Sequence, residues 1–170
     1  MRLIARDGTS LTLHPLRYQL AAGTGPDDDL WLVIGGHLRV GDRSWSFEDP
    51  CLRIDEAYEL SAWLRQAAEG DVRPQPMPDR PEEDWAPSLR FIEPVLAFSL
   101  AARDEAGVVV RVHCSLEAAP PWLDQDGRLP WGYAVTLRVH PRELRQAATQ
   151  WAYQLDTLPP REPAAGQAPP

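Results

Sequence analysis

The sequence predicts an α+β fold in which a mainly antiparallel β-sheet of about seven to eight strands packs against two amphipathic helices. Apolar and polar residues alternate in several short stretches, which is typical of half-buried strands. In two other stretches, about 55–69 and 141–157, apolar residues recur with the period of a helix. The chain has 170 residues, and we expect residues 1–158 to form one domain.

The first two strands follow from alternation near the N-terminus. The segment SLTLHPLRYQL (10–20) keeps a loose period of two, and Pro15 marks an edge or a bend. A loop rich in glycine, proline and aspartate follows at 21–29. Alternation resumes over 30–40 around Gly35-Gly36, where we expect a bulge or a close approach of the backbone to a neighbour.

The next segment turns from strand to helix. Gly41-Asp42 is expected to connect a hairpin whose returning strand carries Trp45 and Phe47 on its core-facing side. Asp49-Pro50 should stop that strand, because proline has no amide donor. Asp55 is the expected N-cap of the helix, and Gly70 closes it.

The second half of the chain begins with residues 71–87, which contain five prolines and a run of acid and are expected to form a surface loop. Apolar alternation over 89–100 and 108–116, joined by a turn at 104–107, predicts a hairpin. A long loop and one more strand precede the second helix, which starts with Pro141 at its first position. The tail 159–170 has little to bury and is expected to be disordered.

Charge and composition limit the partners of the chain. The net charge is -8 and all 17 cationic side chains are arginine. This balance argues against nucleic acid and against an anionic membrane as partners, and it is compatible with a basic protein. The start MRLIARDG reaches charge too early for a signal peptide, no stretch approaches ~20 apolar residues, and we expect a cytoplasmic protein, monomeric or homodimeric.

No residue pattern predicts a catalytic nucleophile, a metal site or a cofactor. Cys51 has acidic neighbours, which raise the pKa of a thiol and make it a poor nucleophile. Cys114 lies on the apolar face of its strand and is expected in the core. The four histidines stand in separate segments without metal-ligand spacing. His113 shares one strand face with Glu117, and we expect that face to be solvated.

Acid and proline recur together at three strand ends, in Glu48-Asp49-Pro50, in Glu93-Pro94 and from Glu117 to Pro121. Carboxylates from these ends could be assembled for hydrolysis, with Glu93 the best single candidate because partial burial would raise its pKa. We favour a structural role for Glu93, as an acceptor of backbone hydrogen bonds at a strand break. Where such strand ends meet in space they would gather acid, and beside tryptophan that is suited to binding a protein.

Five segments together resemble the WapI family of bacterial immunity proteins. They are WLVIGGHL (31–38), WSFEDPCL (45–52), ELSAWL (59–64), LRFIEPVLAF (89–98) and SLEAAPPWL (115–123). The resemblance implies a non-catalytic protein that binds and neutralises the toxic C-terminal domain, often a nuclease, of a polymorphic toxin. It supplies no catalytic residues and does not identify the binding face.

An inhibitor of such a toxin would place acid on a basic cleft and anchor itself with tryptophan. The expected contacts are acidic or tryptophan residues in loops and at strand ends: Asp27, Asp28, Asp29, Glu48, Glu82, Glu83, Asp84, Trp85, Trp122, Asp124 and Asp126. Two alternatives stay open at this point. One is a binding module for another protein or peptide, through a sheet edge for example. The other is a small hydrolase that uses Glu93, His113 and Glu117.

Overall fold

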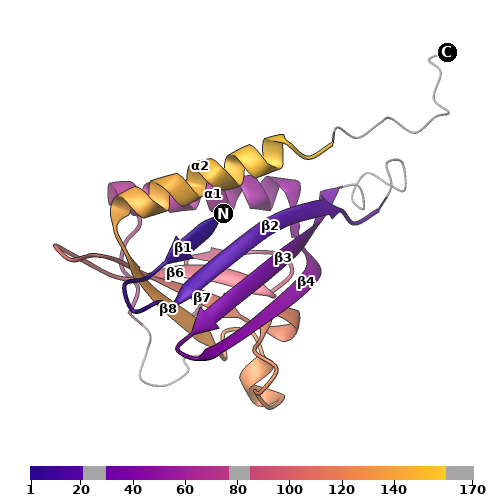
Figure 1. The fold of residues 1–170 in the computed structure, drawn as a ribbon, viewed down its shortest axis with the longest axis horizontal. Coiled ribbons are helices and arrows are strands. Elements are labelled where there is room, and N and C mark those ends of the chain that lie inside the picture. The colour runs from indigo at the N-terminus through magenta and orange to yellow at the C-terminus, as the bar shows by residue number, and fades with distance from the viewer. Residues whose placement is uncertain (21–29, 77–84, 160–170) are drawn as a thin grey trace.

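The strands are divided between two antiparallel four-stranded sheets, where the sequence had suggested one (Figure 1). The computed structural model describes residues 1–20, 30–76 and 85–159. The first sheet has the order β1-β2-β3-β4 and the second β5-β6-β7-β8. The strands are β1 (Arg2–Ile4), β2 (Ser10–Tyr18), β3 (Trp31–Val40), β4 (Arg43–Arg53), β5 (Leu89–Arg90), β6 (Leu96–Asp104), β7 (Gly107–Cys114) and β8 (Ala134–Val139).

Two helices, α1 (Ile54–Glu69) and α2 (Pro141–Asp156), lie beside each other along one side of the sheets (Figure 1). Their contact is close because hydrogen bonds cross it: Trp151 Nε1–H donates to the carbonyl of Ala57 at 2.7 Å, and Ser61 Oγ–H to that of Ala148 at 3.0 Å. The apolar faces of both sheets and both helices form one buried cluster. The predicted α+β class and both helices are therefore confirmed. None of the helices in the described part is long and apolar enough to cross a membrane.

The helix ends match the sequence in two of three respects. Gly70 ends α1 in the left-handed region, with φ 101°, and Pro141 opens α2. The prediction that Asp55 caps α1 is wrong. Arg53 is the N-cap, and its amide donates to a carboxylate oxygen of Glu56 at 2.9 Å, while Asp55 accepts from the Arg53 side chain at 3.2 Å.

Two predictions about β3 and β4 need correction. Gly35-Gly36 is not a bulge; the irregularities lie in the strands on either side, at Leu16 in β2 and in β4, where Pro50 and Cys51 together face the single residue Val33. Asp49-Pro50 therefore does not end the strand, which continues to Arg53, because an edge strand tolerates a proline at a bulge. The other expectation for the glycines holds, since a Cβ on Gly36 would lie 2.0 Å from the Phe47 ring.

The prediction that the strand face around His113 is solvated is also wrong. The His113 side chain is fully buried, because chain from either side of residues 77–84 covers that face of the second sheet. The Gln75 amide donates to the carbonyl of Leu100 at 2.7 Å, and Arg111 donates to the carbonyl of Gln75 at 2.8 Å. Trp85 places its ring centroid 5.5 Å from that of His113.

Smaller differences concern the ends of the predicted elements. β1 was not predicted, whereas the predicted four-residue turn at 104–107 is confirmed, because Asp104 pairs with Gly107 around Glu105-Ala106. Two short 3₁₀ helices, η2 (Leu116–Ala118) and η3 (Asp126–Arg128), lie in the loop before β8. Most of the predicted disordered tail, from 160 onward, lies outside the described residues.

Candidate functional site

The three acid-proline strand ends meet in the structure. Asp49, Glu93 and Glu117, one carboxylate from each, line a single cleft with a volume of about 420 Å³. The sequence pattern had indicated that acid gathers wherever such ends converge, and this is confirmed. The cleft, called the acidic cleft below, is lined by Gln19, Trp31, Asp49, Pro50, Glu93, Val95, Leu116 and Glu117.

Each carboxylate is brought to the cleft by an irregular piece of backbone. Asp49 stands next to the β4 bulge, and bulges redirect the side chains around them. Glu93 lies in the turn between β5 and β6. Glu117 follows Leu116, which has a φ of 49° and is one of two non-glycine residues of the described chain in the left-handed region. Such conformations cost about 1–3 kcal/mol and cluster at binding and catalytic sites.

The three carboxylates repel one another. Burial, Glu117 and Glu93, in that order, raise the pKa of Asp49 above its usual range. Within the described residues, none of the three is in an ion pair. The cleft is therefore a concentration of negative charge that an incoming cation would neutralise. No set of three or more metal-ligating residues in the described ranges is arranged to hold a metal ion.

Apolar side chains lie around this charge. Trp31 is half-buried and lines the cleft. Ile92, the neighbour of Glu93, is 63% exposed, although its side chain is large and apolar. Leu20, the neighbour of Gln19, is also exposed. Exposed apolar groups beside a charge that a partner would cover are typical of the strongly contributing part of a protein interface.

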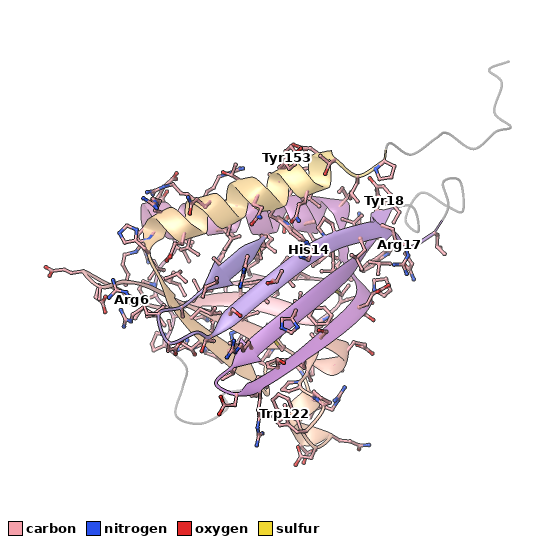
Figure 2. All side chains as sticks on the ribbon, viewed as in Figure 1. Arg6, His14, Arg17, Tyr18, Trp122 and Tyr153 are labelled. Carbon is pink, nitrogen blue, oxygen red and sulfur yellow. The ribbon has the colours of Figure 1, made fainter. Side chains whose placement is uncertain are left out.

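The chain that follows Glu117 leads to an exposed tryptophan. Ala118, the last residue of η2, packs beside β4 and is buried, and its carbonyl accepts from the Trp45 indole N–H at 2.9 Å. Farther along, Trp122 is 40% exposed, its ring 5.3 Å from that of Trp45, with the Arg43 guanidinium 5.1 Å from the ring centre. Trp122 lies at the hairpin end of the first sheet, away from Arg17 and Tyr18 at the other end of β2 (Figure 2).

Of the remaining predicted contacts, four lie in the described residues and six lie outside them. Glu48 lies on the opposite face of β4 from the core and is paired with Arg17 at 2.7 Å. Trp85 packs against His113 and donates to the carbonyl of Pro76 at 3.3 Å. Its side chain is therefore partly covered by the protein's own residues. Asp124 accepts from the Gly127 amide at 2.9 Å, and Asp126 is exposed in η3. The other predicted contacts lie outside the described residues: Asp27, Asp28, Asp29, Glu82, Glu83 and Asp84.

The residues considered for hydrolysis do not all come together. Glu93 and Glu117 share the acidic cleft, but His113 does not line it; the His113 Nε2 lies 2.9 Å from Ser99 Oγ, between the rings of Trp85 and Trp131. The Cys51 thiol is buried, and burial followed by the charge of Asp49 raises its pKa.

The carboxylate that holds the strand break is Glu56, not Glu93. Glu93 is exposed, whereas Glu56 is 7% exposed and accepts from the Ile92 amide at 2.6 Å. Sequence reasoning assigned no role to Glu56. The known sequence signal for such a cap is a serine or threonine at the N-cap with a glutamate three residues later. Here the N-cap is Arg53, so the signal is incomplete and Glu56 was not recognised.

Comparison with known proteins identifies a family. The model of the immunity protein WapI-like family matches residues 2–159, which includes every element described above. No curated protein and no solved structure matches the chain.

Proposed function

The chain belongs to the immunity protein WapI-like family, and from this membership, which assigns it a role in toxin immunity, we propose that it is a non-catalytic inhibitor. It binds the toxic C-terminal domain of a polymorphic toxin in the bacterial cytoplasm and occludes the active site of that domain. The family match over residues 2–159 carries this proposal. The geometry of the surface supports the choice of binding face.

The acidic cleft is the proposed centre of that face. Asp49, Glu93 and Glu117 have no cationic partner among the described residues, so an arginine or lysine of the toxin would neutralise them. Trp31 and Ile92 supply apolar contact around the charge. A buried, hydrogen-bonded charge pair of this kind is worth about 2–5 kcal/mol when one partner is removed.

The partner that fits this surface is basic. A toxin that acts on nucleic acid needs clustered positive charge to bind phosphate, and the same charge would attract the cleft. Trp122, which follows Glu117 along the chain, adds a second contact, because its exposed ring is suited to a pocket on the partner. The Arg43 guanidinium over that ring holds it in place before binding.

The distribution of charge along the chain separates attraction from docking. Eight of the 25 acidic residues and two of the 17 arginines lie in 21–29, 77–84 and 160–170, so these segments carry six of the eight net negative charges. They include six of the contacts predicted from the sequence, from Asp27 to Asp29 and from Glu82 to Asp84. In this proposal these segments accelerate encounter over long range, and the cleft provides the specific contact.

Co-expression tests the proposed function. The toxic domain encoded nearest to the gene of this chain is expressed in a bacterial host with and without the chain. We expect the chain to restore growth and to bind the purified domain with a Kd below ~1 µM, weakening as salt is added. A host that stays inhibited although the chain is abundant and folded would refute the proposal. Hydrolysis by the chain alone of a peptide or glycoside substrate would support the hydrolase alternative.

A further inference from the structure

Glu56 connects two segments that are far apart in the sequence. Its carboxylate is 7% exposed in the first turn of α1. One oxygen accepts from the Arg53 amide at 2.9 Å and the other from the Ile92 amide at 2.6 Å. A buried carboxylate that accepts two backbone amides is strongly held, because hydrogen bonds to a charged group are about twice as strong as neutral ones. The turn after β5 is thereby attached to the start of α1.

That turn carries part of the acidic cleft. It is fixed on one side by Phe91, which is buried with its ring 6.3 Å from that of Phe98. The Ile92 amide is fixed by Glu56, so the side chains of Ile92 and Glu93 point outward with their backbone held at two adjacent residues.

The other amide held by Glu56 belongs to the end of β4. Arg53 is the last residue of β4, four residues after Asp49. Glu56 therefore connects the strand that carries Asp49 to the turn that carries Glu93. These two carboxylates repel each other, and the connection through Glu56 opposes their separation.

We propose that Glu56 is a positioning residue for the binding face: it keeps Asp49 and Glu93 at the spacing that a cation of the toxin requires, and it does not contact the toxin. This inference rests on the proposed function. Burial prevents direct contact, so an effect of Glu56 on affinity has to act through the turn.

Glu143 provides a matched control. It occupies the same position in α2 that Glu56 occupies in α1, and it accepts from the His140 amide at 2.6 Å. It lies beside Arg138 and His140, and it does not line the acidic cleft. Glu56→Gln removes the carboxylate from two amides, those of Arg53 and Ile92, and Glu143→Gln removes it from one, that of His140. Both variants weaken the cap of a helix, but only the first releases the turn that carries Glu93.

The experiment measures two quantities in each variant. One is hydrogen exchange of the Ile92 amide, and the other is the Kd for an inactive form of the toxic domain that the chain protects against. We expect Glu56→Gln to accelerate Ile92 exchange and to weaken binding about 5-fold or more, whereas Glu143→Gln changes neither. In a Glu93→Gln background, Glu56→Gln should have little further effect on affinity, because the group that it positions has lost its charge.

The outcomes distinguish this inference from the proposed function. If the unmodified chain does not bind the toxic domain, the proposed function fails. If the unmodified chain binds and Glu56→Gln binds equally well with the Ile92 amide released, the positioning role alone is refuted. Equal losses of affinity in Glu56→Gln and Glu143→Gln would also refute it, because they would indicate a general loss of stability.

Discussion

Acidification should destabilise this protein through His113. The side chain is fully buried on β7, and no described group hydrogen-bonds to its Nδ1. The rings of Trp85 and Trp131 lie 5.5 and 6.1 Å away. Burial, with a smaller contribution from the charge of Arg111, lowers the pKa of His113 from 6.5 to about 4.

The size of the effect follows from this difference in pKa. Below pH 6.5 the unfolded chain binds a proton at His113 that the folded chain does not bind, so the free energy of unfolding falls as the pH falls. The loss is ~2 kcal/mol between pH 7.5 and pH 5, and it reaches about 3 kcal/mol near pH 4, where the folded protein also takes up the proton.

Urea unfolding at pH 7.5, 6 and 5 measures this loss. The variant His113→Gln keeps a group that can bond to Ser99 Oγ but cannot be protonated in this range. Other titrating groups contribute equally to both proteins, so the difference between their pH profiles isolates His113. We expect the unmodified protein to lose ~2 kcal/mol more than the variant on going to pH 5. Parallel profiles would show that His113 is accessible to protons in the folded state.

Three further predictions concern packing, thiol chemistry and association. Gly36→Ala should lower the free energy of unfolding by about 2 kcal/mol or more in thermal unfolding, because its Cβ would lie 2.0 Å from the Phe47 ring. Gly35→Ala should cost less than ~1 kcal/mol, because its Cβ would meet a flexible leucine side chain at 3.1 Å. Equal costs for the two variants would contradict this packing. Cys51 and Cys114 should resist alkylation at pH 8 until the chain is unfolded, because burial raises the pKa of both thiols, and rapid labelling of the native protein would show otherwise. The association rate with the toxic domain, measured by stopped flow, should fall steeply between 50 and 500 mM salt while the dissociation rate changes little, and a salt-independent association rate would rule out steering.

Local patterns were sufficient to predict much of the fold. Both helices follow from apolar periodicity and from residues with a backbone reason to stand at a helix end, Gly70 and Pro141. The repeated pattern of acid and proline indicated that acid gathers wherever those strand ends meet, and Asp49, Glu93 and Glu117 do line one cleft. The helices and this pattern depend on residues close to one another in the sequence, and a single sequence reports them directly. That the three strand ends meet depends on the fold.

Features that depend on distant contacts were not predicted. The burial of His113 requires chain on both sides of residues 77–84 to return over the second sheet, and strand alternation cannot show this. The β4 strand continues through Pro50 because a bulge and an edge position accommodate the proline. Glu56 reaches an amide 36 residues away, at Ile92, and no local pattern indicates that contact. The short β1 has only three residues, too few to show a period.

The affinity of a variant without charge in the acidic cleft shows whether the toxic domain binds there. The variant Asp49→Asn/Glu93→Gln/Glu117→Gln removes the three cleft carboxylates. The matched control, Glu59→Gln/Glu69→Gln/Glu105→Gln, removes three exposed carboxylates that do not line the cleft. Because the cleft variant relieves repulsion at Asp49, it should be at least as stable as the unmodified protein.

Calorimetric titration with the toxic domain at fixed salt gives the Kd of each protein. We expect the cleft variant to bind about 30-fold more weakly or worse, because the complex loses a charge pair that binding would bury, while the control stays within about 3-fold of the unmodified protein. If the cleft variant is folded and binds as tightly as the control, the toxic domain does not engage this cleft, and the proposed binding face is wrong.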